Sequence, residues 1–150
     1  MSLSSFQVFK DIEQKYIDQL QPLFENFACP AGQTVIAQGA PADYLYLLES
    51  GNVEISFKPY DADSITITHI REGGLFGWTA LIGGPKYTSS GIAVEAVSAM
   101  RIRGTDLRRL CEQNPEAGQV ILDRLAGAVS ARWKNSHEQV RSILGSGLNS

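Results

Sequence analysis

Two short apolar runs joined by a glycine turn constrain the fold of this chain more than any other feature. Residues 44–48 and 53–57 lie on either side of Ser50-Gly51-Asn52, and the second run alternates apolar and polar side chains. Alternation with a period of two is typical of a strand that buries one face, and glycine adopts the positive φ that tight turns require. The pattern therefore predicts a β-hairpin at this point.

The same spacing of short strands and turns extends through the middle of the chain. Proline and glycine interrupt the apolar runs at residues 30–32 and 39–41. Further strands are predicted at residues 23–29, 34–37, 65–69, 92–97 and 99–102. About eight short strands at regular spacing predict a mainly β domain, a jelly-roll barrel or double-stranded β-helix with flanking helices.

Helical patterns flank the strands at both ends. Apolar side chains recur at helical spacing over residues 6–20, which predicts one amphipathic helix or two short helical pieces that end at Pro22. Thr105 is expected to cap a short helix, and Asn114-Pro115-Glu116 has the order of an N-cap, an N1 proline and a first-turn carboxylate. The expected organisation is an N-terminal helical segment at 1–21, a β-roll core at 22–104, C-terminal helices at 105–144 and a flexible tail at 145–150.

The last predicted helix is longer than the covering of one small barrel requires. At about 1.5 Å per residue, an unbroken helix from residue 115 to residue 144 would reach about 45 Å. The surplus favours a homodimer seam or a lever that moves with a bound ligand, and the alternative is a helix that packs and then frays after Trp133. Its apolar face comprises Ile121, Leu122, Leu125, Ala128, Val129, Trp133, Val140 and Leu144.

Composition and charge narrow the class of protein. The 150 residues are 43% hydrophobic and 19% charged, which fits a single domain with its own core. The formal net charge of −3 disfavours a main partner that is nucleic acid or an anionic membrane, since both select basic surfaces. No apolar run reaches the roughly 20 residues of a membrane span, and the N-terminus lacks signal-peptide features, so we expect a cytoplasmic protein.

Residues 76–88 predict a small anion site. Phe76-Gly77 precedes an apolar stretch that is expected to form a helical turn, and a tight glycine-proline loop with one cation follows. Free backbone amides at a helix start carry partial positive charge, and a nearby lysine completes a site for a phosphate. The candidate ligand-binding residues are Phe76, Gly77, Trp78, Thr79, Ala80, Lys86, Tyr87 and Thr88.

Three features of this loop each have a structural alternative. The indole of Trp78 is either an aromatic wall on which a planar ligand stacks or a plug that fills the pocket. Lys86 is either an anion contact or a solvated loop charge. The hydroxyls of Thr88, Ser89 and Ser90 suit a phosphate, but hydroxyls in a loop are also typical of turns.

The sequence shows no recognisable catalytic or metal-binding pattern. His69 is expected in a strand and His137 on a polar helix face, without the further clustered ligands that a metal site needs. Cys29 and Cys111 fit no metal-ligand spacing, and we expect two reduced thiols. No nucleophile lies in a recognisable arrangement and the acidic residues are scattered, so we expect neither an enzyme nor a bound metal or cofactor.

The order of strands, glycine turns, anion loop and closing helix resembles the cyclic nucleotide-binding domain family. This family includes the sensor module of catabolite activator-like bacterial regulators and of eukaryotic kinase regulatory subunits. The resemblance extends over roughly residues 9–133 and implies the β-roll fold of that family. It rests on Ala31-Gly32, Gln38-Gly39, residues 44–47, residues 50–53, Gly73, Phe76-Gly77, Ala80-Leu81 and Pro85-Lys86.

The resemblance also implies a ligand mode, from which this chain departs at two positions. Family members follow the Phe-Gly pair with a glutamate that holds the ribose 2′-hydroxyl, whereas this chain has Trp78. They pair the cyclic phosphate with an arginine, whereas this chain has Lys86. Lysine keeps the positive charge but lacks the planar guanidinium that donates two hydrogen bonds in a bidentate geometry. Tyr87 stands where a small residue is common, so we expect the usual mode of recognition to be altered.

We therefore expect a stand-alone ligand-sensing module that signals through its C-terminal helix to another protein. Cyclic AMP and cyclic GMP are the candidate ligands, and a homodimer is the expected assembly. One alternative is a structural or dimerisation module whose pocket is occluded, and another is a sensor for a different phosphorylated or anionic metabolite. A DNA-binding regulator is disfavoured, because the acidic chain shows no basic helix-turn-helix after Leu144.

Overall fold

The computed structural model describes residue 3 and residues 6–60, 62–82 and 84–128. The predicted continuation of the last helix beyond residue 128, with Trp133 and His137, lies outside the described residues, as does the predicted tail at 145–150. Within the described part of the chain, no helix is both long and apolar enough to cross a membrane.

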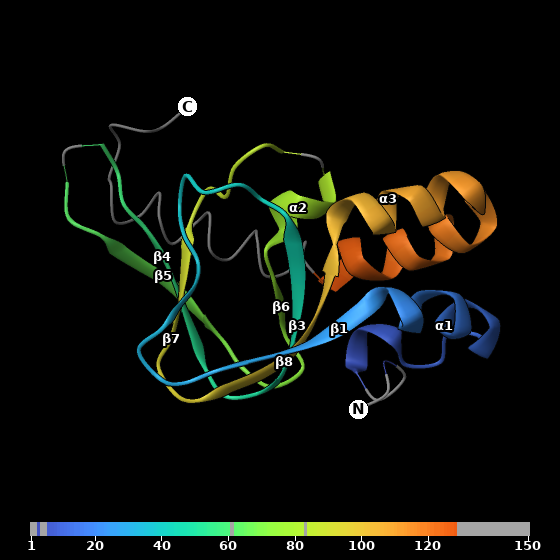
Figure 1. Ribbon diagram of the computed structural model, residues 1–150, viewed down its shortest axis with the longest axis horizontal. Helices are drawn as coiled ribbons and strands as arrows, with labels where there is room; N and C mark the ends of the chain where they lie inside the picture. The colour runs from blue at the N-terminus through green and yellow to red at the C-terminus, as the bar shows by residue number, and fades with distance from the viewer. Residues whose placement is uncertain (1–2, 4–5, 61, 83, 129–150) are drawn as a thin grey trace.

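In the described residues, eight strands form two antiparallel sheets that face each other, with helices before and after them (Figure 1). The mainly β fold predicted from the sequence is thereby confirmed. The first sheet has the order β1-β8-β3-β6 and the second β2-β7-β4-β5. The strands are β1 (Phe24–Cys29), β2 (Thr34–Ile36), β3 (Tyr44–Ser50), β4 (Val53–Phe57), β5 (Ile65–Ile70), β6 (Leu75–Phe76), β7 (Ser90–Ala93) and β8 (Val97–Arg103).

The predicted hairpin between β3 and β4 is wrong, although both strands are present. β3 pairs with β6 and β8 in the first sheet, and β4 pairs with β5 and β7 in the second. The turn at Gly51 therefore carries the chain from one sheet to the other. Its φ is +105°, and a Cβ there would lie 2.5 Å from the carbonyl oxygen of Ala96, so the crossing requires glycine.

Another sequence-based strand, at residues 92–97, is divided in the structure. β7 ends at Ala93, a bend follows at residues 94–96, and Val97 begins β8. The chain must reverse here to move from the second sheet to the first, and its three bend residues are exposed. A continuous apolar run therefore supplied residues to two strands in different sheets.

β3 is buried on both of its faces, and it separates two hydrophobic clusters. Leu45 and Leu47 point to one side, and Tyr46 and Leu48 to the other. The inter-sheet cluster comprises Cys29, Ile36, Tyr46, Leu48, Val53, Ile55, Ile70, Phe76, Tyr87, Ala93, Val97 and Ala99. The helical cluster comprises Leu3, Phe6, Phe9, Tyr16, Ile17, Leu20, Leu45, Leu47, Leu75, Leu81, Met100, Ile102, Leu107, Ala117, Ile121 and Leu125.

The helices lie on the outer face of the first sheet and form the helical cluster with it. The N-terminal segment forms two short helical pieces, which is one of the two arrangements predicted from the sequence. They are the 3₁₀ turn η2 (Gln7–Phe9) and the helix α1 (Gln14–Leu20). A second 3₁₀ turn, η3 (Gln21–Leu23), leads into β1. The short helix α2 (Trp78–Ile82) lies between β6 and β7 in the chain. After β8 come α3 (Gly104–Gln113) and a helical segment at residues 115–128.

The two predicted helix starts at this end differ in outcome. α3 begins at Gly104, two residues earlier than predicted, so Thr105 lies inside the helix and does not cap it. The Asn114 cap is confirmed, because its side-chain oxygen accepts a hydrogen bond from the Ala117 amide at 3.3 Å.

Polar contacts join the C-terminal helical segment to the N-terminal helix α1. The Asn114 side-chain amide donates to Gln19 Oε1 at 2.7 Å, and the Tyr16 hydroxyl donates to Glu116 Oε1 at 2.6 Å. The hydrogen bond from Tyr16 and the nearby charge of Lys15 lower the pKa of Glu116. The two ends of the described chain are therefore held against each other by polar as well as apolar contacts.

Candidate ligand site

The turn from β6 into α2 is built around Gly77, as the sequence predicts. Gly77 has φ of +84°, and a Cβ at this position would lie 2.6 Å from the Tyr44 carbonyl oxygen. Glycine is therefore required both by the backbone conformation and by the close approach of β3. The Ala80 amide donates back to the Gly77 carbonyl at 3.1 Å, which closes the first turn of α2.

Phe76 and Tyr87 lie together in the inter-sheet cluster. The ring of Phe76 stacks on Tyr46 with a centroid separation of 4.8 Å and an interplanar angle of 4°. Tyr87 is 7% exposed, and its hydroxyl donates to the Tyr44 carbonyl at 2.6 Å and accepts from the Tyr44 amide at 3.0 Å. Burial raises the pKa of Tyr87 to about 12, with the Tyr44 hydrogen bond acting in the opposite direction.

Trp78 lies on the other side of the first sheet from Tyr87. It is partly buried and packs against the helical cluster. The indole therefore packs on the side of the sheet that the helices cover, whereas the phenol of Tyr87 occupies the space between the sheets. Trp78, the side chain considered as a pocket plug, is thus not part of the inter-sheet cluster, whereas Tyr87 is.

Of the remaining predicted ligand residues, Thr79 and Ala80 lie within α2, and Lys86 and Thr88 lie on the loop that follows it. Lys86 and Thr88 are exposed, and Lys86 forms an isolated bridge with Pro41. The backbone of Tyr87 anchors the loop, since its amide donates to Ala40 and its carbonyl accepts from Gly39, both at 2.9 Å. The structure thus divides the predicted set among an inter-sheet group, a helix-facing indole and an exposed loop.

A second polar group on the inner face of the first sheet was not predicted from the sequence. Arg101 Nε donates to Glu25 Oε1 at 2.8 Å, and its Nη1 lies 3.4 Å from the Tyr46 hydroxyl. The guanidinium also lies 4.0 Å from the centroid of the Tyr44 ring and 5.0 Å from that of Phe27. Arg101 alternates with the buried Val97 and Ala99 in β8, and an arginine on an apolar strand face was the available signal.

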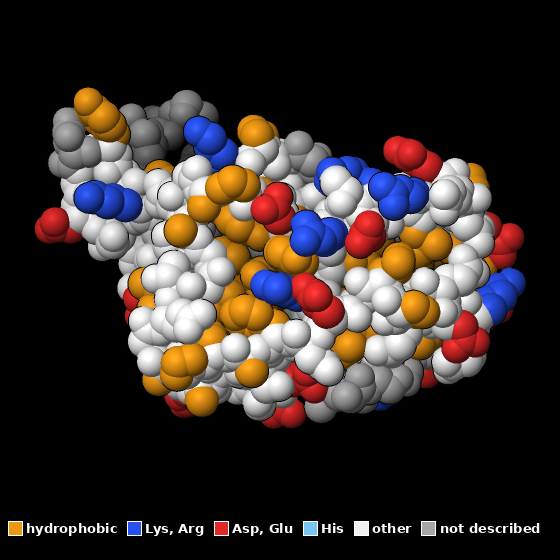
Figure 2. Space-filling view, in the orientation of Figure 1, with side chains coloured by type: hydrophobic (Ala, Val, Ile, Leu, Met, Phe, Trp, Pro, Cys, Tyr) orange, Lys and Arg blue, Asp and Glu red, His pale blue; other side chains and the backbone are white. Residues whose placement is uncertain are grey.

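In the orientation of Figure 1, hydrophobic side chains gather near the middle of the visible face, with basic and acidic side chains among them (Figure 2). In the Arg101 group, one cation contacts two aromatic rings and a carboxylate. Its charge is therefore largely satisfied within the domain.

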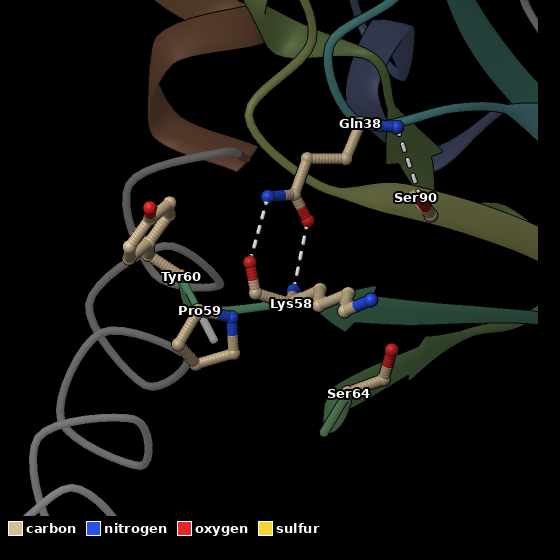
Figure 3. A pocket seen from close by; sticks show the side chains of 6 residues that line it. All are labelled: Gln38, Lys58, Pro59, Tyr60, Ser64 and Ser90. Atoms are coloured by element: carbon tan, nitrogen blue, oxygen red, sulfur yellow. Dashed lines mark hydrogen bonds between the residues drawn. The ribbon is translucent and has the colours of Figure 1, made fainter. Parts of the chain in front are cut away.

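A pocket of about 470 Å³ lies at the end of the β4–β5 pair (Figure 3). The side-chain amide of Gln38 forms two hydrogen bonds, of 2.9 and 2.8 Å, with the backbone of Lys58. The backbone amide of Gln38 donates to Ser90 Oγ at 2.9 Å. None of the eight candidate ligand-binding residues lines this pocket, but Ser90, whose hydroxyl was also considered for a phosphate, does. Its lining consists of Gln38, Lys58, Pro59, Tyr60, Ser64 and Ser90.

The described residues hold two free thiols and no cluster of metal ligands. No group of three or more His, Cys, Asp or Glu side chains in this part of the chain could hold a metal ion. Cys29 and Cys111 are free thiols, and burial raises the pKa of both. A raised thiol pKa reduces the thiolate fraction at neutral pH and hence the reactivity.

Comparison with known proteins identifies the family. The family model of the cyclic nucleotide-binding domain matches residues 27–114, which is more than half of the chain. A CRP-like cAMP-activated global transcriptional regulator of Mycobacterium tuberculosis is 29% identical over 119 residues, covering 79% of this chain and 53% of the regulator. A cAMP-dependent protein kinase regulatory subunit of Aspergillus fumigatus is 36% identical over 81 residues, covering 54% of this chain and 19% of the subunit.

Solved structures show the same fold over most of the chain. A protein of Geobacter metallireducens GS-15 proposed to bind cyclic nucleotides is 30% identical, with a TM-score of 0.76 and coverage of 87% of this chain and 95% of that protein. The Catabolite Activator Protein of Thermus thermophilus is 21% identical, with a TM-score of 0.73, and the match covers 91% of this chain and 62% of that protein.

This chain spans about half the length of the bacterial regulator it matches. The matched part contains the end of β1, the strands β2 to β8, α2 and the loop that leads to β7. Domains of this kind are sensor domains of regulators and are typically non-catalytic. The chain belongs to the cyclic nucleotide-binding domain family.

Proposed function

We propose that this chain is a regulatory sensor that binds a cyclic nucleotide or another small phosphorylated or anionic ligand. The observation that carries the proposal is the family match over residues 27–114, a range that includes β6, α2 and the following loop. The proposed contacts are those predicted from the sequence at residues 76–80 and 86–88, among which the Trp78 indole is turned away from the space between the sheets. The proposed role is binding and signalling, not catalysis.

Cyclic AMP and cyclic GMP are the first ligands to test. Two relatives are described by their names as cAMP-activated or cAMP-dependent, which supports this order. Trp78 replaces an acceptor with an indole donor, and Lys86 replaces a two-toothed donor with a single ammonium group. These replacements support a wider panel of phosphorylated metabolites, because they conserve charge recognition better than ribose recognition.

Signalling is proposed to run through the C-terminal helices to a protein effector. A ligand would favour one arrangement of α2 and these helices over another, because only a difference in contact between two states shifts their populations. We further propose a cytoplasmic homodimer that contacts no DNA or membrane through this chain. Native mass spectrometry of the purified protein reports the assembly and any small molecule that co-purifies with it.

A second candidate function is a structural or dimerisation module without a ligand. The buried Tyr87 supports it, because both hydrogen-bonding directions of its hydroxyl are used by β3 and its ring fills space between the sheets. In that case residue 87 belongs to the core of the domain, and the loop serves only to connect α2 with β7.

Thermal unfolding with added ligand separates the two functions. A ligand present at about 100 times its Kd stabilises a domain by about 2.7 kcal/mol, which corresponds to a rise in Tm of about 5–10 °C at this chain length. Cyclic AMP, cyclic GMP and a panel of phosphorylated metabolites are compared at equal concentration. An unchanged Tm across the whole panel would favour the structural module.

Lys86→Ala tests the proposed anion contact. Lys86 is exposed, so the variant should keep the stability of the parent and bind a phosphorylated ligand about 10-fold more weakly. Lys10→Ala removes an exposed lysine outside the proposed site and serves as the matched control. Equal affinity of the Lys86 variant and the control, measured by titration calorimetry, would remove Lys86 from the site.

A further inference from the structure

The C-terminal end of α2 is attached to α3 by a side-chain hydrogen bond. Arg108 Nη1 donates to the Ala80 carbonyl oxygen at 2.6 Å. In a regular helix this oxygen would accept from the Gly84 amide, but that amide donates to Thr79 at 3.1 Å. The guanidinium therefore satisfies a carbonyl that the short helix leaves without its regular donor.

The Ala80 carbonyl also lies directly against the first residue of α3. A Cβ at Gly104 would come within 2.0 Å of the Ala80 oxygen and 2.7 Å of its carbonyl carbon. Gly104 is itself fixed, because its amide donates to the Asp43 carbonyl at 2.9 Å. Two independent features, a charged hydrogen bond and a close backbone approach, thus meet at one peptide group of α2.

Arg108 differs from the next residue along the helix. It is partly buried, and among the described residues the Ala80 carbonyl is its one hydrogen-bond partner, without a carboxylate within ion-pair distance. Arg109 has a side chain that is 66% exposed and lies 3.8 Å from Asp106 on its own helix. The chain therefore supplies a matched arginine that, among the described residues, makes no hydrogen bond or ion pair with α2.

The contacts continue from α3 into the C-terminal helical segment. Leu81 of α2, Leu107 of α3, and Ile121 and Leu125 all belong to the helical cluster. Figure 1 shows α2 beside the start of α3. The contacts at Ala80 would therefore resist a displacement of α2. A displacement that did occur would shift α3 and the C-terminal helical segment, because all three share the helical cluster.

We infer that Arg108 is a positioning residue that locks α2 to α3, so that the predicted ligand loop and the C-terminal helices move together. The lock concerns contacts within the chain and requires no ligand. Its regulatory consequence rests on the proposed function: ligand binding at α2 is passed to residues 115–128 through Arg108. Without this bond, α2 would respond to a ligand while residues 115–128 would not.

Hydrogen exchange without ligand tests the lock itself. Loss of a charged hydrogen bond should raise exchange in peptides covering α2 by about 10-fold or more in Arg108→Ala, with β3 and β8 unchanged. Arg109→Ala should exchange as the parent does. Arg108→Lys keeps the positive charge with a different reach, so it should give a smaller increase in exchange than Arg108→Ala. It replaces the alanine variant in the test if that variant folds poorly. Exchange in both Arg108 variants equal to that of Arg109→Ala would overturn the lock.

Exchange with cyclic AMP as the probe tests the consequence. In the parent and in Arg109→Ala, the probe should slow exchange both in α2 and at residues 115–128. In Arg108→Ala the protection should remain in α2 and be lost at residues 115–128, even when the probe is saturating. Protection of both regions in every variant would overturn the transmission through Arg108. No protection anywhere in the parent would contradict cyclic AMP as the ligand, and the experiment without ligand would still decide the lock.

Discussion

Tyr87→Phe is the most direct test of how the loop after α2 is held. The substitution removes one oxygen and keeps the ring in the inter-sheet cluster, so the apolar packing is conserved. It breaks the hydrogen bond to the Tyr44 carbonyl at 2.6 Å and the one from the Tyr44 amide at 3.0 Å. The variant therefore isolates the attachment of the loop to the start of β3.

The expected loss follows from these two bonds. Each intramolecular hydrogen bond contributes about 1 kcal/mol, so Tyr87→Phe should lose about 2 kcal/mol of unfolding free energy. At this chain length the loss corresponds to a fall in Tm of about 4–8 °C. Tyr60→Phe removes a hydroxyl from a residue that is 94% exposed, and this control should leave the stability within about 0.5 kcal/mol of the parent.

Alkaline pH gives a second readout of the same hydroxyl. The pKa of Tyr87 is raised to about 12 in the folded protein from the ordinary 10.0, so the unfolded chain releases its proton first. This contribution to stability is complete below pH 10 and is lost as the pH rises toward 12. Its upper limit is about 2.7 kcal/mol, and the difference between the parent and Tyr87→Phe should shrink over this range.

Urea unfolding at neutral pH and at several alkaline pH values measures both effects. Tyr16 and Tyr46 also have raised pKa values, but they are present in parent and variant alike and cancel in the difference. A Tyr87→Phe protein as stable as the Tyr60→Phe control, with a difference from the parent that does not depend on pH, would refute the inference that the hydroxyl holds the loop.

Three further substitutions test the turn, the cap and the indole. Gly77→Ala should lose about 3 kcal/mol or more in urea unfolding, because of its positive φ and its contact with β3, whereas Gly73→Ala, with φ of +84° and open space, should lose about 1 kcal/mol. Asn114→Ala should lose about 1 kcal/mol in thermal unfolding and Asn114→Asp almost nothing, and equal losses would contradict the cap. Trp78→Glu should lose about 2–4 kcal/mol by exposing the helical cluster to a carboxylate, and calorimetry with cyclic AMP would show whether a ribose contact is gained.

The strands were predictable from the sequence, but their pairing was not. Alternation and turn residues are local properties, and they identified the runs that became β3 and β4. Whether two adjacent strands pair depends on contacts with strands distant in sequence, here β6, β7 and β8. One signal was available: residues 44–48 are apolar at nearly every position, which is typical of a strand covered on both faces. A hairpin with one exposed face would alternate more strictly.

The candidate site was predictable to a similar degree. Gly77 could be identified because a turn between an apolar run and a short helix requires positive φ. The direction of Trp78 could not, since the phase of a five-residue helix decides whether its first side chain faces the helices or the other sheet. The bond between Arg108 and Ala80 joins residues 28 positions apart, and it depends on how α2 docks. Neither residue carries a local signal of the contact.

The buried phenol of Tyr87 has a direct consequence for ligand affinity. A ligand that enters between the sheets meets Tyr87, and moving its phenol costs about 2 kcal/mol of hydrogen bonding, or about 30-fold in affinity. Tyr87→Phe removes this cost and keeps the ring, so a sensor should bind its ligand more tightly in the variant while being less stable. A structural module should lose stability and gain no binding. The same variant therefore separates the two candidate functions, because stability and affinity change in opposite directions in only one of them.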